Sequence, residues 1–347
     1  MSDIPSPQPP NNMSPAVALR HLNTGYWISQ AIAVAAKLGI ADLLKDGPKT
    51  CDELAQVAGA DPQALYRLLR GIASVGVFAE DAHGRFTLTH LATLLRADVP
   101  GSLRAAAMMG GEEWEWRPWG ALLHSVRTGQ PAFDHLFGMA FDDYLARHPE
   151  AADIFHGFMN SVTAAEATAV APAYDFADIT TIVDVGGGHG ALLAAILKAN
   201  SHLRGVLFDA PHVVAEAGGF LEAQGVAQRC DLVAGNFFEG LPAGADAYIL
   251  KWILIGWDDA RAVTILRTCH GALKAGSKLL VIERIIPPGN APFYGKLADL
   301  NLLVLYRGRH RTEAEYRALF AEAGFELARI IPTSSPTEFS ILEGIRP

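Results

Sequence analysis

A glycine-rich turn between a short apolar strand and an apolar helix constrains the fold of this chain more than any other feature. The pattern predicts a strand over Thr181–Val185, a turn over Gly186–Gly190 and a helix that begins at Ala191. Glycine has no Cβ, so its backbone tolerates positive φ and lets a ligand approach closely. The helix that follows presents unpaired N–H groups and the positive end of its dipole. The segment is therefore predicted to bind a ligand at the end of a buried strand.

Two acidic residues near this turn indicate which ligand it holds. Asp209 ends the next apolar run, roughly 20 residues further on, where a carboxylate accepts hydrogen bonds from ribose hydroxyls. Asp184 lies two residues before the first glycine of the turn, where it would repel a pyrophosphate and attract a cationic amino-acid group. The arrangement favours S-adenosylmethionine over NAD as the ligand. An ordinary strand–turn–helix without a ligand is the alternative interpretation.

Composition and charge exclude several classes of protein. The chain has 347 residues, of which 50% are hydrophobic and 19% charged, so it is long enough for two domains with a large core. The net charge of −9 argues against nucleic acid as a partner, because such affinity rests on lysine and arginine neutralising phosphates. We therefore expect a small-molecule partner.

The cysteines and the first residues indicate the compartment. Cys51, Cys230 and Cys269 lack the spacing of zinc or redox sites, so we expect free thiols, no metal and a reducing compartment. Residues 1–14 are polar and proline-rich, which predicts a disordered tail and not a signal peptide. No segment is apolar for the 18 or so residues that a membrane span needs. A cytoplasmic protein is expected.

Residues 15–105 are predicted to form a helical domain that ends in a hairpin. The run over Tyr26–Leu38 is apolar on all sides, Thr50 and Glu53 make a capping box, and Asp61-Pro62 starts another helix. A hairpin turn follows at Asp81–Gly84. Two helices before a small hairpin is the winged-helix arrangement. A winged-helix transcriptional regulator is therefore one hypothesis, but the acidic chain and the apolar helix favour a dimerisation domain.

Residues 106–347 are predicted to form a helical connector followed by a doubly wound α/β domain. The connector over 106–170 is rich in large side chains, of which Phe155 and Met159 are candidates for contacting a substrate at a domain junction. Alternating strands and helices after residue 180 predict a mainly parallel sheet with ligands at the carboxyl ends of its strands. The predicted strands are Thr181–Val185, Gly205–Phe208, Asp231–Ala234, Ala247–Leu250, Lys278–Glu283, Leu327–Ile331 and Glu338–Leu342.

Segments at these strand ends resemble the plant-type small-molecule O-methyltransferases and their bacterial relatives, the caffeate and hydroxyneurosporene methyltransferase group. The matching segments are Asp184–Gly190, Phe208–His212, Gly235–Phe238, Leu250–Leu254 with Trp257–Asp259, and Arg309–Tyr316. The resemblance covers nearly the whole chain. It implies a metal-independent homodimeric methyltransferase with a Rossmann-like class I domain and an N-terminal dimerisation domain.

The resemblance also assigns the residues that bind the cofactor. It implies that the turn with Asp184, Gly186 and Gly188 holds the methionine part of S-adenosylmethionine and that Asp209 holds the ribose. Asn236 and Phe237 are implied to bracket the adenine, and Lys251 to approach the cofactor. The family usually has aspartate at position 236, so asparagine there is expected to weaken binding without abolishing it.

The catalytic base of the family is missing. Relatives carry a histidine just before Asp-Trp at the end of the fourth strand, and here Ile255 takes that position. Of the two glutamates that orient the histidine, Glu283 is retained and His310 replaces the other. We expect His310 to act as the base with Glu283 as its orienter. Alternatively, the substrate ionises unaided or has a nitrogen or carbon nucleophile, or the chain binds the cofactor for a hydroxylase, decarboxylase or cyclase reaction.

The remaining candidates line the expected substrate side. Tyr306 and Arg307 replace small residues of the family, and they narrow the pocket if they point inward or meet solvent if they point outward. Trp252, Asp299 and Asn301 are further candidate contacts, together with Ile255 itself. The sequence thus predicts a dimeric methyltransferase that acts on a small, partly aromatic molecule, with oxygen as the expected acceptor.

Overall fold

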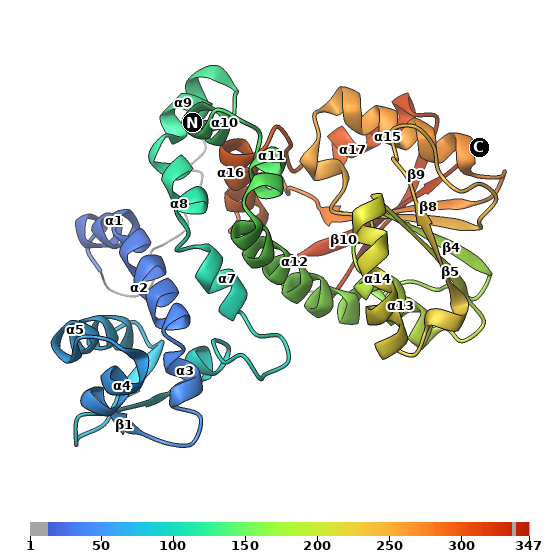
Figure 1. Ribbon diagram of the computed structural model, residues 1–347. Coiled ribbons are helices and arrows are strands. Elements are labelled where there is room, and N and C mark those ends of the chain that lie inside the picture. The colour runs from blue at the N-terminus through green and yellow to red at the C-terminus, as the bar shows by residue number, and fades with distance from the viewer. Residues whose placement is uncertain (1–12, 335–337, 347) are drawn as a thin grey trace. The chain divides into compact units, whose positions relative to one another are not determined.

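The computed structural model describes residues 13–334 and 338–346, and these divide into two units (Figure 1). One unit comprises residues 13–121 and 142–162, and the other comprises residues 122–141 and 163–346. The expected connector over 106–170 is therefore shared between them. Most of the tail predicted over residues 1–14 lies outside the described residues. None of the described helices is long and apolar enough to cross a membrane.

The first unit contains the predicted helices and hairpin. The capping box of Thr50 and Glu53 is present at the start of its helix, and the hairpin pairs Phe78 with Leu88. A further short strand pairs with the hairpin, which makes a three-stranded sheet in the order β1-β3-β2. The elements are α1 Pro15–Asn23, α2 Gly25–Lys37, α3 Ile40–Leu43, β1 Lys49–Thr50, α4 Cys51–Ala58, α5 Pro62–Ala73, β2 Phe78–Glu80, β3 Arg85–Leu88, α6 His90–Thr93, α7 Arg104–Met109, α8 Glu113–Gly120 and α11 Phe141–Arg147.

The first two helices expose apolar side chains. Helix α1 has no buried residue, and α2 buries only alanines, namely Ala33, Ala35 and Ala36. The exposed residues on these helices include Leu19, Leu22, Tyr26 and Trp27. Several exposed apolar side chains on adjacent helices are typical of protein–protein interfaces.

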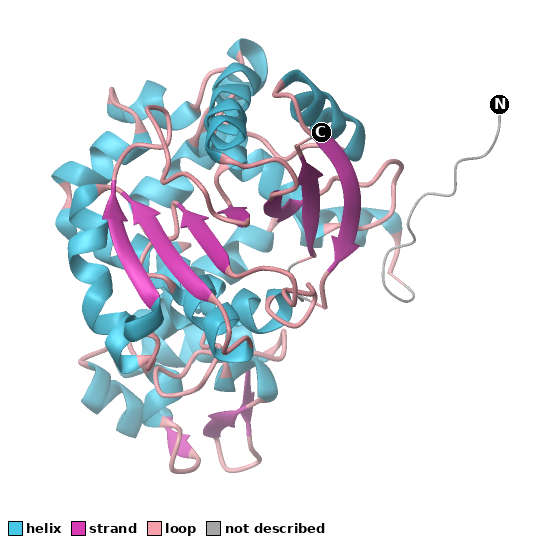
Figure 2. Cartoon of the chain, turned by 90° about the vertical axis from the view of Figure 1, so that its right-hand side faces the viewer, coloured by secondary structure: helices cyan, strands magenta, loops and turns pink. Residues whose placement is uncertain are grey.

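The second unit is built on a seven-stranded sheet in the order β6-β5-β4-β7-β8-β10-β9 (Figure 2). Strands β6, β5, β4, β7 and β8 run parallel to one another, whereas β10 is antiparallel to both of its neighbours, β8 and β9. The predicted strands are all present, with small differences at their ends. They are β4 Thr181–Val185, β5 Arg204–Asp209, β6 Cys230–Ala234, β7 Ala247–Lys251, β8 Lys278–Arg284, β9 Glu326–Pro332 and β10 Phe339–Ile345.

Helices cover both faces of this sheet, because successive strand residues point to opposite faces. Ile249 and Ile282 pack in one core with α13 and α14, whereas Leu250 and Val281 pack in a second core with α15 and α17. The helices are α9 Leu122–Thr128, α10 Ala132–Phe137, α12 Pro149–Val170, α13 Ala191–Ala199, α14 Pro211–Ala223, α15 Asp259–Ala272, α16 Tyr294–Leu305 and α17 Glu313–Glu322, and α12 belongs partly to the first unit.

Helix α16 is the main element that the sequence pattern does not predict. Its N-cap position is Phe293, which makes no side-chain cap, so the usual start signal is missing. By contrast, α17 begins with the capping box of Thr312 and Glu315 that the sequence shows.

The close approach of two loops at Gly308 gives a test of the fold. A Cβ at Gly308 would overlap the carbonyl oxygen of Ile255 and lie 2.6 Å from the carbonyl carbon of Gly256, so the backbone would have to move. We expect Gly308→Ala to lower the free energy of unfolding by about 3 kcal/mol, as measured by urea denaturation. Gly256→Ala, in the same contact but with open space around its Cβ, is the control and should change stability by less than about 1 kcal/mol. Equal effects of the two variants would show that the loops are not in contact.

Candidate active site

The glycine-rich turn has the backbone geometry that its sequence predicts. Gly186, Gly188 and Gly190 have φ angles of 68°, 59° and 85°, which residues other than glycine rarely adopt. A Cβ at Gly186 would strike Ile253, and one at Gly187 would come within 2.6 Å of Asp184 Oδ2. Among the described residues other than Gly188 and its two chain neighbours, no atom lies within 4 Å of the Cβ position of Gly188. The turn is thus packed tightly on its inner side and open at Gly188.

Asp209 is adjacent to this turn, as expected for neighbouring parallel strands. Its Oδ2 accepts a hydrogen bond from the N–H of Gly188 at 2.8 Å, and its Oδ1 accepts one from the N–H of Ala210 at 2.6 Å. The carboxylate therefore joins the end of β5 to the open position of the turn.

Asp184 lies differently from the expectation. Its side chain is only 1% exposed and lies beneath Gly187, because both faces of the sheet are covered at β4. Burial raises the pKa of its carboxyl to about 7, against the opposing effect of Lys251. The carboxylate therefore supports the turn from inside and does not line its open side.

Asn236 and Phe237 lie in the loop after β6. The Oδ1 of Asn236 accepts a hydrogen bond from the N–H of Phe238 at 3.0 Å, and its Nδ2 donates one to Glu239 at 2.9 Å. The ring of Phe237 lies 3.9 Å from the Cβ position of Gly186 and meets Trp257 edge-on. The aromatic side chain is thus next to the glycine-rich turn, and Asn236 shapes the loop that carries it.

Lys251 ends β7 in a buried ion pair that the sequence does not reveal. Its Nζ lies 2.8 Å from a carboxylate oxygen of Glu166 and donates a hydrogen bond to Thr163 Oγ1 at 3.1 Å. Both partners are on α12, far away in the sequence. Glu166 is buried, so the ion pair offsets part of the cost of burying both charges.

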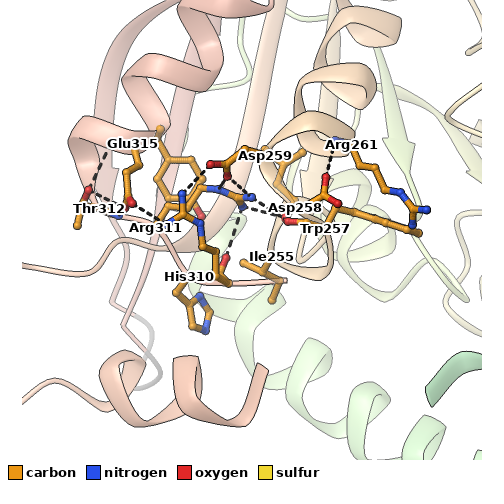
Figure 3. A network of polar contacts seen from close by, with 12 residues as sticks. Ile255, Trp257, Asp258, Asp259, Arg261, His310, Arg311, Thr312 and Glu315 are labelled. Carbon is orange, nitrogen blue, oxygen red and sulfur yellow. Dashed lines mark hydrogen bonds and ion pairs between the residues drawn. The ribbon is translucent and has the colours of Figure 1, made fainter. Parts of the chain in front are cut away.

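A buried arginine fixes the turn that carries Ile255 (Figure 3). Arg311 has no exposed surface and donates hydrogen bonds to the carbonyl oxygens of Leu254 at 2.9 Å and Trp257 at 2.8 Å. Its Nε also donates to Asp259 at 2.9 Å. These bonds hold both sides of the short 3₁₀ turn over Leu254–Gly256. Position 255, where the family resemblance leads us to expect a histidine, is therefore held by hydrogen bonds on both sides of its turn, and it is occupied by an apolar side chain.

Glu283 does not orient His310, contrary to the expectation. Its carboxylate accepts hydrogen bonds from the N–H of Ile255 at 3.1 Å and from the hydroxyl of Tyr316. The alternation of β8 directs Glu283 to the face covered by α15 and α17, where Tyr316 lies. Within the part of the chain that the structure describes, Glu283 makes no hydrogen bond to His310. Burial raises the pKa of the Glu283 carboxyl to about 7.

His310 is buried and its imidazole is incompletely bonded. The residue is 5% exposed, its backbone N–H donates to Asp299 Oδ1 at 2.6 Å, and its Nδ1 has no hydrogen-bond partner among the described residues. Figure 3 shows the imidazole directed away from the network around Arg311, on the side where Ile255 points. Burial and the charges of Arg284 and Arg311 lower the pKa of His310 to about 4. The imidazole is therefore neutral at pH 7.

Among the other residues expected on the substrate side, Arg307 faces solvent and the rest are at least partly buried. Arg307 points outward, since its side chain is 66% exposed and forms an ion pair with Asp134 at 3.1 Å. The ring of Tyr306 packs edge-on against Phe141. Trp252 has a φ of 58° and stacks on Phe339. Of the remaining candidates, Asn301 is half-buried on α16, and Phe155 and Met159 are half-buried on α12 in the first unit.

Sequence reasoning misses Arg284, although the alternation of β8 could have indicated it. Arg284 directly follows Glu283 and so faces the opposite side of the sheet, where it is 5% exposed. Its guanidinium lies over the rings of Trp252, Tyr294 and Phe339, at 5.5, 5.3 and 4.4 Å from their centroids. The carboxyl end of β8 thus carries a buried acid on one face and a buried cation on the other.

The buried carboxyl of Glu283 gives a prediction for stability. Its pKa is raised from 4.5 to about 7 in the folded chain, so folding favours the protonated form and the free energy of unfolding falls as pH rises from about 4.5 through 7. In Glu283→Gln the side chain does not ionise, so its contribution to this decrease in unfolding free energy disappears. We expect the decrease in unfolding free energy between pH 5 and pH 8 to be smaller in the variant by about 1 kcal/mol or more, as measured by denaturation at each pH. Parallel curves for the two proteins would contradict the raised pKa.

Comparison with known proteins shows which family the chain resembles. The chain matches the model of the O-methyltransferase domain over residues 119–326 and that of the O-methyltransferase dimerisation domain over residues 20–98. It is 47% identical to the phenazine O-methyltransferase PhzM of Lysobacter antibioticus over 329 residues, which cover 94% of this chain and 96% of the relative.

Solved structures agree with this match. The crystal structure of LaPhzM superposes with a TM-score of 0.91 at 46% identity and covers 96% of this chain and 100% of that one. The O-methyltransferase NcsB1 from neocarzinostatin biosynthesis, solved with S-adenosylmethionine and 2-hydroxy-5-methyl naphthoic acid, superposes with a TM-score of 0.79 at 35% identity, over 92% of this chain and 96% of that one. The chain therefore belongs to the O-methyltransferase family and is an S-adenosylmethionine-dependent methyltransferase.

Proposed function

We propose that this enzyme methylates an oxygen of a planar aromatic small molecule whose hydroxyl ionises without help from a strong base. The relatives support an aromatic substrate, since their names specify a phenazine and their complexes a naphthoic acid. The observation that carries the proposal is the environment of Ile255, where relatives place their base. Isoleucine accepts no proton, and the neighbouring Glu283 is bonded to Tyr316 and to the backbone of Ile255.

The residues at the glycine-rich turn fit S-adenosylmethionine. When bound, the cofactor supplies an electrophilic methyl group on a positively charged sulfur. The open side of Gly188 leaves room for the ligand against the backbone, and Asp209 offers acceptor oxygens at the same place for ribose hydroxyls. Phe237 offers an aromatic face beside Gly186 for the adenine, and Lys251 lies at the end of the adjoining strand.

The lack of a base limits which acceptors react. A simple phenol with a pKa of about 10 is almost wholly protonated at pH 7, and a general base would contribute roughly 10²–10⁴ in rate. An acceptor hydroxyl with a lower pKa is already an anion and needs only the correct orientation toward the methyl group. The enzyme therefore favours acidic hydroxyl groups over ordinary phenols.

The dimer and the location are further parts of the proposal. The dimerisation-domain match and the exposed apolar residues on α1 and α2 support a homodimer formed through these helices. The three cysteines are free thiols in the structure, which supports a reducing compartment such as the cytoplasm.

Incubation with labelled cofactor tests the proposed reaction. The purified enzyme is mixed with methyl-labelled S-adenosylmethionine and a panel of aromatic hydroxyl compounds, carboxylates and amines, and the products are identified by mass spectrometry. Transfer of one labelled methyl group to an acidic hydroxyl supports the proposal. Consumption of substrate without labelling would instead show a hydroxylase, decarboxylase or cyclase reaction.

Reintroducing the family base should broaden the range of acceptors. In Ile255→His the new imidazole is next to Glu283, which already contacts the backbone of residue 255. We expect kcat/KM for a weakly acidic phenol to rise by about 10-fold or more, and that for an acidic hydroxyl compound to change little. Ile255→Leu is the control for the volume of the side chain. Activity that is equally low on weakly acidic phenols in both variants would contradict the proposed reason for the preference.

Removal of the Asp209 carboxylate should weaken cofactor binding. We expect Asp209→Ala to raise the Kd of S-adenosylmethionine by about 100-fold in calorimetry, since charged hydrogen bonds contribute roughly 1.5–3 kcal/mol each. Asp231→Ala, at an exposed ion pair with Arg204, should leave the Kd unchanged. An unaltered Kd in Asp209→Ala would remove this residue from the cofactor site.

A further inference from the structure

We propose that Glu166 makes the enzyme prefer the cationic cofactor S-adenosylmethionine over its neutral product, S-adenosylhomocysteine, by compensating the positive charge of Lys251. The inference rests on the part of the proposed function that assigns the cofactor to the glycine-rich turn. The two ligands differ by one methyl group and by the positive charge on sulfur, so a charge near the turn affects their binding unequally. Glu166 is thus a specificity-determining residue that acts through Lys251.

Lys251 lies at the level of the glycine-rich turn. Val185 of β4 pairs with Leu250 of β7 in parallel register, so the residues that follow them, Gly186 and Lys251, are neighbours at the ends of two adjacent strands. Gly186 is the first glycine of the turn, and the side chain of Lys251 is only 7% exposed. An uncompensated ammonium group in this place would repel a cationic ligand at the turn more strongly than it would in water.

Lys251 and Asp184 lie on the same face of the sheet. Asp184 pairs in register with Ile249, and the alternation of β7 places Ile249 and Lys251 on one face. Helix α12 covers that face, since Ile249 packs in one core with Ala167 and Val170. The charge of Lys251 therefore acts in the same buried space as the Asp184 carboxyl, where it opposes the rise in the pKa of that carboxyl.

Glu166 on α12 supplies the compensating charge. Its Oε2 lies 2.8 Å from Lys251 Nζ, and its side chain is only 1% exposed. Thr163, three residues earlier on the same helix, accepts a hydrogen bond from the same ammonium group at 3.1 Å. The ammonium group is therefore held toward α12, and solvent screens neither partner of the ion pair.

A second cation lies on the same face. Lys251 pairs in register with Ile282 of β8, and the alternation of that strand places Arg284 on the side of Ile282. The carboxylates of Glu166 and Glu338 both act on Arg284. Glu166 thus balances positive charge from two strands, and its neutralisation would make this face of the sheet more positive by one unit.

The balance of these charges determines the selectivity between cofactor and product. Asp184 and Asp209 at the strand ends favour a cation at the turn, and an uncompensated Lys251 would oppose them. The ribose, the adenine and the amino-acid group are the same in both ligands, so damage to their contacts changes both Kd values equally. A change of one buried charge changes mainly the Kd of the ligand with the charged sulfur, and we expect an effect of about 10-fold.

Calorimetry without a methyl acceptor tests the inference. The Kd values of S-adenosylmethionine, S-adenosylhomocysteine and sinefungin, which carries a protonated amine in place of the sulfonium, are measured for each variant. We expect Glu166→Gln to raise the ratio of the S-adenosylmethionine Kd to the S-adenosylhomocysteine Kd by about 10-fold, and the ratio for sinefungin to follow it. Glu166→Asp keeps the charge and should stay within about 3-fold of the wild-type ratio. Glu216→Gln, at an exposed ion pair with His189 of the turn, is the control for an equal change of charge in solvent and should leave the ratio unchanged.

The opposite change at Lys251 separates a charge effect from damage to the fold. Lys251→Met removes the positive charge and should lower the same ratio, because the carboxylate of Glu166 then acts on the cation at the turn. The double variant Glu166→Gln/Lys251→Met removes both charges and should return to within about 3-fold of the wild type. Structural damage would instead shift the ratio in neither single variant, or in the same direction in both.

Two results would overturn the inference. One is an equal change in the Kd of all three ligands in Glu166→Gln, and the other is a shift of the ratio in the same direction in Glu166→Gln and Lys251→Met. If Glu166→Gln does not fold, Lys251→Met and the double variant decide by the same ratio. Unaltered ratios together with weakened binding in Asp209→Ala would contradict this inference alone, whereas an unaltered Kd in Asp209→Ala would contradict the assignment of the cofactor to the turn.

Discussion

The hydrogen bonds of the buried Arg311 guanidinium organise the loops around Ile255. One side chain satisfies two carbonyl oxygens and a carboxylate, so its removal would leave several polar groups unpaired in the interior. The turn that carries Ile255 is fixed by these bonds, and Glu283 and Gly308 contact that turn from other segments. His310 takes its direction from the same short loop. A change in this one guanidinium would therefore disturb the turn that carries Ile255 and the loop that carries His310.

The sequence predicts the shape of the glycine-rich turn and its contact with Asp209, because this geometry follows from local rules. Adjacent parallel strands bring their carboxyl ends to one edge, so the contact between Gly188 and Asp209 can be expected from two motifs alone. The family resemblance adds the residues of the later loops. Asp184 is expected to face the ligand, but its carboxylate lies buried beneath Gly187. Only the structure shows this packing.

The arrangement of the residues expected around the methyl acceptor depends on contacts between segments that are distant in the sequence. Local sequence patterns do not reveal such contacts. Glu283 pairs with Tyr316 and not with His310, because α17 delivers a hydroxyl to that face of β8. Arg307 turns to solvent because Asp134 on α10 offers a partner there. The burial of Arg284 could not be foreseen either, because the three aromatic rings that surround its guanidinium come from separate elements.

The buried carboxyl of Asp184 has a consequence for the thermodynamics of cofactor binding. Its pKa of about 7 means that it is partly protonated near neutrality, beneath the turn to which we assign the positively charged cofactor. A cation above the turn favours the ionised carboxylate, so association is coupled to the release of a proton into the solution. The heat of association then depends on the ionisation enthalpy of the buffer, and the apparent affinity rises with pH until the carboxyl is fully ionised.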